Sequence, residues 1–187
     1  SNMFNSDKFT FMQCLLINIC HLYRKNEFKP MNLRLNGTSD IQFLDIPIDV
    51  NLSLSNWLYN RYQIPINSGQ YKSIYHLILE NQLNIKSYDY TKILTPNKIY
   101  KSLDCNYHLT MSYDGKKQDD KNTKACKLAI QKNINIAMAF QHVKKSECFK
   151  PTYSLYGQEI ETIDGDLSDQ RWQDPKNKIV CLRYKRN

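Results

Sequence analysis

Polar side chains gather in short motifs whose residue types suit the binding of a phosphate group or a hydrated cation. One motif is Arg34-Leu35-Asn36-Gly37-Thr38-Ser39-Asp40-Ile41, and another is Tyr88-Asp89-Tyr90-Thr91-Lys92. Two carboxylates that hold Mg²⁺ could also activate a water molecule. The expected ligand-binding residues are Arg34, Asn36, Thr38, Ser39, Asp40, Asp89, Thr91, Lys92 and Ser112, and the expected metal ligands are Asp40, Asp89 and Asp166.

A structural role for the same motifs stays open. Asn-Gly and Asp-Gly pairs form turns, and Ser, Thr and Asp cap helices. Between Asp164 and Asp174 a structural role is favoured, because Arg171 is expected to pair with a nearby Asp and to pin the last strand. His108 is expected to pack within a strand rather than to act as a base. The sequence has no P-loop, no G-x-G-x-x-G and no G-x-S-x-G motif, so no catalytic residue is assigned and enzymatic activity stays undecided.

Hydrophobic periodicity predicts the elements that must position these residues. Strands are expected at 31–36, 84–88, 106–112, 134–140, 160–163 and 179–183, and helices at 9–23, 54–61, 71–81, 96–103 and 122–131. Because helices alternate with strands, the sequence predicts an α/β fold with a mainly parallel sheet of about six strands. The sheet could be open or could form a partial (β/α) barrel, within a single domain over residues 4–187.

A parallel sheet would bring the polar motifs together. Neighbouring parallel strands place their carboxyl ends side by side, about 4.8 Å apart per strand, and ligands bind beyond those ends. Asn36, Asp40, Asp89 and Lys92 are therefore expected around one cleft, although about 50 residues separate the two motifs in the chain.

Composition indicates a folded protein with a positive net charge. Of the 187 residues, 41% are hydrophobic and 24% are charged, which is enough apolar material for a core and too little charge for disorder. The net charge of +8 fits either a polyanionic partner, such as a nucleic acid, or simple solubility. The six cysteines form no C-x-x-C pair, so free thiols in a reducing cytosol are expected.

The start of the chain carries no targeting signal that we can identify. Ser1 and Asn2 look like the remnant of a cleaved tag, so Met3 is the expected natural start. No apolar run approaches the roughly 18 residues that a membrane span needs. A cytoplasmic protein, bacterial or in an infected cell, is expected.

Four blocks together resemble a known protein family. They are Arg34–Ile41, Tyr88–Lys92, Asn106–Ser112 and a C-terminal block with Ile163-Asp164-Gly165-Asp166, Asp169, Arg171, Asp174, Pro175 and Ile179–Lys185. The family occurs in phages, prophages and plasmids, and the resemblance covers residues 4–187 in the same order. Its members resemble divergent relatives of the radical-SAM barrel, which implies a TIM-barrel-like core.

The chain departs from that family in two respects. Similar proteins carry a cysteine-rich segment ahead of the first helix, where this chain begins, and Cys14 and Cys20 lie within the helical pattern instead. Gln42-Phe43 and Tyr113-Asp114-Gly115 also replace the Trp-Glu and Arg-Ser-Glu that the family tends to have. An iron–sulfur cluster is therefore not expected in this chain.

These observations predict an accessory protein of a mobile element or virus. It would bind a phosphate-bearing ligand, a nucleotide or nucleic acid, at the carboxyl ends of the strands, with the possible help of a divalent cation. The alternative is a non-catalytic interaction module, an inhibitor or adaptor of a host or phage protein, and a large exposed apolar patch would favour it.

Overall fold

The computed structural model describes residues 7–36, 41–115, 121–141, 143–144 and 146–184. The chain forms two compact units. Unit 1 comprises residues 1–87 and 101–107, and unit 2 comprises residues 88–100 and 108–187.

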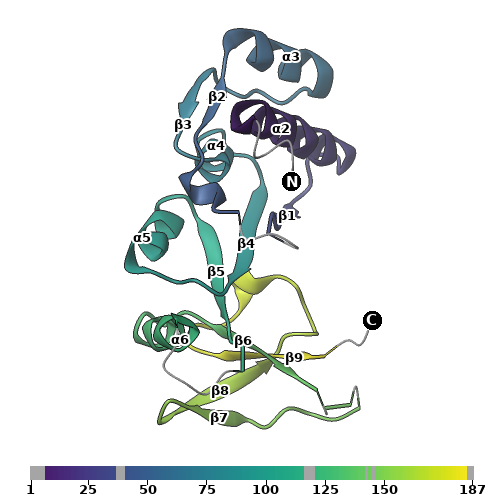
Figure 1. The fold of residues 1–187 in the computed structure, drawn as a ribbon. Coiled ribbons are helices and arrows are strands. Elements are labelled where there is room, and N and C mark those ends of the chain that lie inside the picture. Colours follow the sequence, from purple (N-terminus) through teal and green to yellow (C-terminus); the bar gives the residue numbers. More distant parts are fainter. Residues whose placement is uncertain (1–6, 37–40, 116–120, 142, 145, 185–187) are drawn as a thin grey trace. The chain divides into compact units, whose positions relative to one another are not determined.

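Five α-helices, two short 3₁₀ helices and nine strands make up the described fold (Figure 1). The helices are α2 (Lys8–Lys25), α3 (Leu52–Tyr62), α4 (Ile74–Glu80), α5 (Pro96–Asp104) and α6 (Lys121–Gln131), with η1 (Phe43–Asp45) and η2 (Arg171–Gln173). The strands are β1 (Met31–Leu33), β2 (Ile48–Val50), β3 (Gly69–Tyr71), β4 (Ile85–Thr91), β5 (Tyr107–Ser112), β6 (Ile136–Phe140), β7 (Thr152–Leu155), β8 (Gln158–Asp164) and β9 (Ile179–Arg183).

Seven of the strands form one open sheet in the order β1-β4-β5-β6-β9-β8-β7. The pairs β1–β4, β5–β6, β6–β9 and β8–β9 are parallel, and β7–β8 is antiparallel. The predicted α/β fold with a mainly parallel sheet is confirmed, and the four N-terminal predicted strands are neighbours in the sheet. The sheet does not close into a barrel.

Unit 1 begins with α2, whose start follows from its capping residue. The Asp7 carboxylate accepts a hydrogen bond from the Thr10 backbone N–H at 3.0 Å, which satisfies one of the free donors of the first turn. The apolar period of the helix then faces the core through Met12, Leu16, Ile19, Cys20 and Tyr23. β1 runs parallel to the first half of β4, and β2 and β3 form a separate antiparallel pair.

Unit 2 contains the most continuous part of the sheet. β9 lies between β6 and β8, with Ala137 opposite Val180 and Ile163 opposite Val180 on the other side. Figure 1 shows β6, β9, β8 and β7 side by side in this order. The core of the unit is apolar and includes Leu109, Met111, Ala125, Cys126, Ala129, Ile136, Val180 and Cys181.

The structure differs from the sequence predictions in several elements. β2, β3 and β7 were not expected, and Tyr71, which was expected in a helix, lies in β3. After β6 the helix–strand alternation stops, and a hairpin takes its place. β6 was expected to be buried on both faces, yet Ala139 is exposed. β5 ends at Ser112, which pairs with Ala137, so the last residues of β6 pair with β9 and no longer with β5.

Two further predictions concern the state of the cysteines and the presence of membrane-spanning helices. All six cysteines are free, with Cys14 and Cys148 exposed and the other four buried. In the part of the chain that the structure describes, no helix combines the length and apolar character needed to cross a bilayer.

Candidate functional site

At the carboxyl end of β4, a lysine of α5 contacts the predicted site residue Thr91. The Asp89 side chain is almost fully buried, and its carboxylate accepts a hydrogen bond from the next backbone N–H at 2.9 Å. Thr91 Oγ1 donates to the Ile93 carbonyl at 2.7 Å and accepts from Lys98 Nζ, on α5, at 2.8 Å. Lys92 is exposed. The strand end and the first turn of α5 thus present a hydroxyl, an ammonium and a carboxylate.

The next strand, β5, carries polar side chains at every second position. Side chains alternate between the two faces of a strand, so His108, Thr110 and Ser112 share one face. Thr110 is fully buried. Asn122 of α6 donates to the Ser112 carbonyl at 2.9 Å and accepts from the Asp114 N–H at 3.2 Å, which ties the end of β5 to the start of α6.

Several buried polar atoms near this face lack hydrogen bonds. They are Nε2 of His108, Oγ1 of Thr110, Nε and Nη1 of Arg171, and Oδ2 of Asp174, considering the described residues. Arg171 is only 1% exposed. Its Nη2 donates to the Gly165 carbonyl at 3.2 Å, and its Nη1 lies 3.1 Å from Asp174 Oδ2 as an ion pair without hydrogen-bond alignment. Buried polar groups normally have a hydrogen-bond partner, so the missing hydrogen bonds of these atoms need an explanation.

The positive charge of Arg171 affects the protonation of His108. Burial and the positive charges of Arg171 and Lys176 lower the pKa of His108, so its imidazole is neutral at pH 7. A neutral imidazole keeps one donor and one acceptor nitrogen. Burial raises the pKa of Asp174, although the charge of Arg171 acts in the opposite direction.

Aromatic packing holds η2 over β4. Trp172 follows Arg171 directly, and its ring lies 5.8 Å from the ring of Tyr88, centroid to centroid. This contact and the ion pair with Asp174 fix the short helix that carries Arg171.

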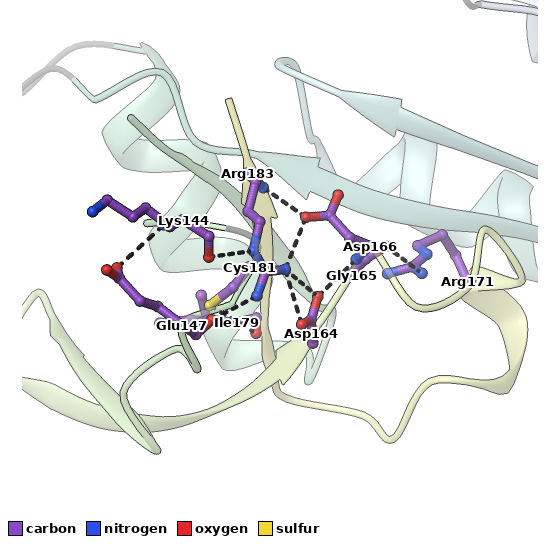
Figure 2. A network of polar contacts seen from close by, with 9 residues as sticks. All are labelled: Lys144, Glu147, Asp164, Gly165, Asp166, Arg171, Ile179, Cys181 and Arg183. Atoms are coloured by element: carbon purple, nitrogen blue, oxygen red, sulfur yellow. Dashed lines mark hydrogen bonds and ion pairs between the residues drawn. The ribbon is translucent and has the colours of Figure 1, made fainter. Parts of the chain in front are cut away.

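A second polar network surrounds Arg183 at the ends of β8 and β9, as Figure 2 shows. Arg183 Nη1 donates to both carboxylate oxygens of Asp164, at 3.0 and 2.9 Å, and to Asp166 Oδ2 at 3.1 Å. Its Nε and Nη2 donate to the carbonyls of Lys144 and Glu147, at 3.2 and 2.8 Å. All three nitrogens of the Arg183 guanidinium donate hydrogen bonds to groups of the chain itself, so this network has a structural role.

Gly165, between Asp164 and Asp166 of this network, is packed too closely against β9 to carry a side chain. A Cβ atom there would lie 2.5 Å from Val180 Cγ1 and 2.7 Å from Leu182 Cδ2. Its backbone N–H donates to the Cys181 carbonyl at 2.8 Å. The expected pairing of Arg171 with a nearby aspartate is confirmed, because Arg171 forms an ion pair with Asp174.

The predicted ligand residues divide between the two units. Arg34, which is exposed, and Asn36, which is half-buried, follow β1 in unit 1, whereas Asp89, Thr91, Lys92 and Ser112 belong to unit 2. Thr38, Ser39 and Asp40 lie outside the described residues, as does His142. The single cleft expected around Asn36, Asp40, Asp89 and Lys92 therefore stays a prediction.

The predicted metal ligands also stay a prediction. Within the described ranges, no three His, Cys, Asp or Glu side chains are grouped as a metal site would need. The Asp166 carboxylate already accepts from the guanidinium and backbone N–H of Arg183, so a cation there would compete with that arginine.

A pocket of about 310 Å³ lies in unit 1, at the amino end of β4. Its lining includes Leu83, Ser87, Cys105 and Asn106. Ligands of parallel sheets bind at the carboxyl ends of the strands, so this pocket does not coincide with the predicted site.

Sequence reasoning missed two contributions to the polar groups of unit 2. The contact of Lys98 with Thr91 was not expected. Lys98 lies in the first turn of the helix that follows β4, and this position could have suggested that it reaches the end of the strand. The orphaned atoms of Arg171 and Thr110 could not be foreseen, because hydrogen-bond satisfaction depends on tertiary packing.

The fold defines an α/β protein with an open, mostly parallel sheet, and polar side chains lie at the carboxyl end of β4 and along one face of β5. The chain belongs to the Gene product 88 family, whose family model matches residues 14–187. This membership confirms the resemblance to a phage-type family. No curated protein and no solved structure matches the sequence.

Proposed function

We propose that this phage-family protein is an accessory protein that binds a phosphate-bearing ligand, a nucleotide or nucleic acid, at the strand ends of unit 2. One observation carries the proposal: the buried Arg171 has Nε and Nη1 without hydrogen bonds among the described residues, and its charge helps to lower the pKa of His108. On the same face of β5 as His108, the buried Thr110 hydroxyl also lacks a partner in the described part of the chain.

Physical chemistry supports an anionic ligand for this cluster. Each unmet buried group costs roughly 1–3 kcal/mol, and more when the group is charged. A phosphate group supplies several acceptor oxygens that match the fork of a guanidinium. Thr110 and the imidazole of His108 can add donors from β5, and Ser112 follows on the same strand face.

The end of β4 and the first turn of α5 add further polar groups, of which Thr91 and Lys92 were predicted from the sequence. Thr91, Lys92 and Lys98 supply a hydroxyl and two ammonium groups at the end of β4. Asp89 is the carboxylate through which a divalent cation would accompany the phosphate. Because Arg171 is covered, binding requires η2 to shift and its ion pair with Asp174 to open.

Thr110→Val tests the proposal at a hydroxyl that has no hydrogen-bond partner among the described residues. Valine keeps the shape and removes the hydroxyl, so the free energy of unfolding without ligand should stay equal or rise. Affinity for inorganic phosphate, pyrophosphate or a nucleoside triphosphate, measured by calorimetry, should fall about tenfold through the loss of one hydrogen bond.

Thr162→Val provides the matched control. The Thr162 hydroxyl donates to the Lys150 carbonyl, so its loss should lower stability and leave phosphate affinity unchanged. The proposal fails if the native protein binds none of these phosphates, or if both variants change affinity alike.

The interaction-module alternative has one observation in its favour. Helix α3 exposes Leu52, Trp57 and Tyr59 and buries only Leu58 among its residues. An adaptor would use such side chains to bind a protein partner, and Trp57→Ser would then abolish binding to that partner while phosphate affinity remained.

A further inference from the structure

Helix α6 presents three lysines on one exposed side. Lys121, Lys124 and Lys127 recur every three residues, are all exposed, and span about 9 Å of the helix axis. The helix contains no Asp or Glu. The ion pairs formed among the described residues involve none of these lysines.

The arrangement is electrostatically unfavourable for the helix itself. Lys121 stands in the first turn, where the positive end of the helix dipole disfavours a cation. Like charges three residues apart on a helix also repel one another. An anion bound along this side would offset both effects.

An aromatic ring lies beside Lys127, the last of the three lysines. Tyr156 and Gly157 form the two-residue turn between β7 and β8, with φ of 52° and 82°. Such turns favour Asn, Asp or Gly, because both central residues need positive φ. Tyr156 is 36% exposed, Lys127 Nζ lies 5.5 Å from the centroid of its ring, and its hydroxyl lies 3.5 Å from Thr123 Oγ1.

Most of the net positive charge of the chain belongs to unit 2, which also contains α6 and Tyr156. Unit 2 holds 17 of the 26 Lys and Arg residues and 11 of the 18 Asp and Glu residues, so six of the eight net positive charges belong to it. A clustered basic surface with an exposed aromatic is the combination that binds single-stranded nucleic acid, through phosphate contacts and base stacking.

We propose that the side of α6 bearing Lys121, Lys124 and Lys127, together with Tyr156, is a docking surface for single-stranded nucleic acid. The lysines contact successive phosphates, and a base stacks on the exposed part of the Tyr156 ring. This surface is independent of the phosphate site near Arg171, so either proposal can fail without the other.

The test is fluorescence anisotropy with a labelled oligothymidine of about 16 nucleotides, the upper site size of a single binding module. Replacing the three lysines by glutamine should weaken binding at least tenfold in low salt. The slope of log K against log salt should fall by about 2, since each phosphate contact on a single strand contributes about 0.7. Tyr156→Asn, which suits the turn, should weaken binding roughly fivefold or more and leave the salt slope unchanged.

Two controls separate the docking surface from general charge and from the other site. Changing the exposed lysines Lys25, Lys86 and Lys150 to glutamine removes the same charge and should change affinity less than threefold. The variant that lacks Lys121, Lys124 and Lys127 should keep the native affinity for inorganic phosphate, because these lysines are not part of the site near Arg171. Equal loss in both lysine triples, no binding by the native protein, or equal affinity for a duplex without dependence on Tyr156 would overturn the proposal.

Discussion

At the scale of single residues, His108 couples stability to pH. Burial and the charges of Arg171 and Lys176 hold the pKa of His108 below its ordinary value of 6.5. The unfolded chain therefore binds a proton more readily than the folded one. The stability associated with the neutral imidazole is complete above pH 6.5 and falls as the pH drops below that value toward the folded pKa.

The matching measurement is chemical denaturation at about pH 7.5 and about pH 5.5, on either side of the unfolded pKa. His108→Gln should lose less stability between these pH values than the native chain does. His21→Gln, at an exposed position, should retain the native pH dependence. An unchanged pH dependence in His108→Gln would show that the imidazole titrates normally.

At the scale of elements, the junction of β8 and β9 depends on the absence of a side chain at Gly165. Gly165→Ala would place a Cβ 2.5 Å from Val180 Cγ1 and 3.0 Å from the Cys181 carbonyl. Overpacking of this kind costs about 1–3 kcal/mol of the free energy of unfolding, measurable by urea denaturation. In a Val180→Ala background the cost should be smaller; an equal cost there would assign the effect to the backbone instead.

The elements also show which parts of the structure follow from the sequence. Periodicity predicted α2, α6 and β9 closely, because their apolar faces are long and regular. β2 and β3 have three residues each, too few to show a period, and β7 lies in a polar segment. Asp89, Thr91 and Ser112 were foreseen at strand ends, whereas the role of Lys98 depends on how α5 packs beside β4.

At the scale of the whole molecule, the buried thiols can report on the two units. Burial raises the pKa of Cys20 and of Cys181 to about 12 and that of Cys105 to about 11, so these thiols are unreactive when folded. In the native protein a thiol reagent should therefore modify Cys14 and Cys148 alone.

Denaturant then tests the expected single domain over residues 4–187. Cys20 and Cys105 belong to unit 1, and Cys126 and Cys181 belong to unit 2. Since β4 and β5 each contain residues of both units, we expect all four thiols to become reactive at the same urea concentration. Mass spectrometry of the labelled peptides would identify them. Exposure of one pair well before the other would indicate two domains.

The position of β9 has a consequence for the protein during translation. β9 is made after β6 and β8, yet it lies between them in the sheet. Until the ribosome has released the chain through Arg183, β6 and β8 each keep an unpaired edge, and such edges invite pairing with other chains. A stalled or truncated product that lacks β9 would therefore be a target for chaperones and proteases, and unit 2 can complete its fold only after synthesis of its last strand.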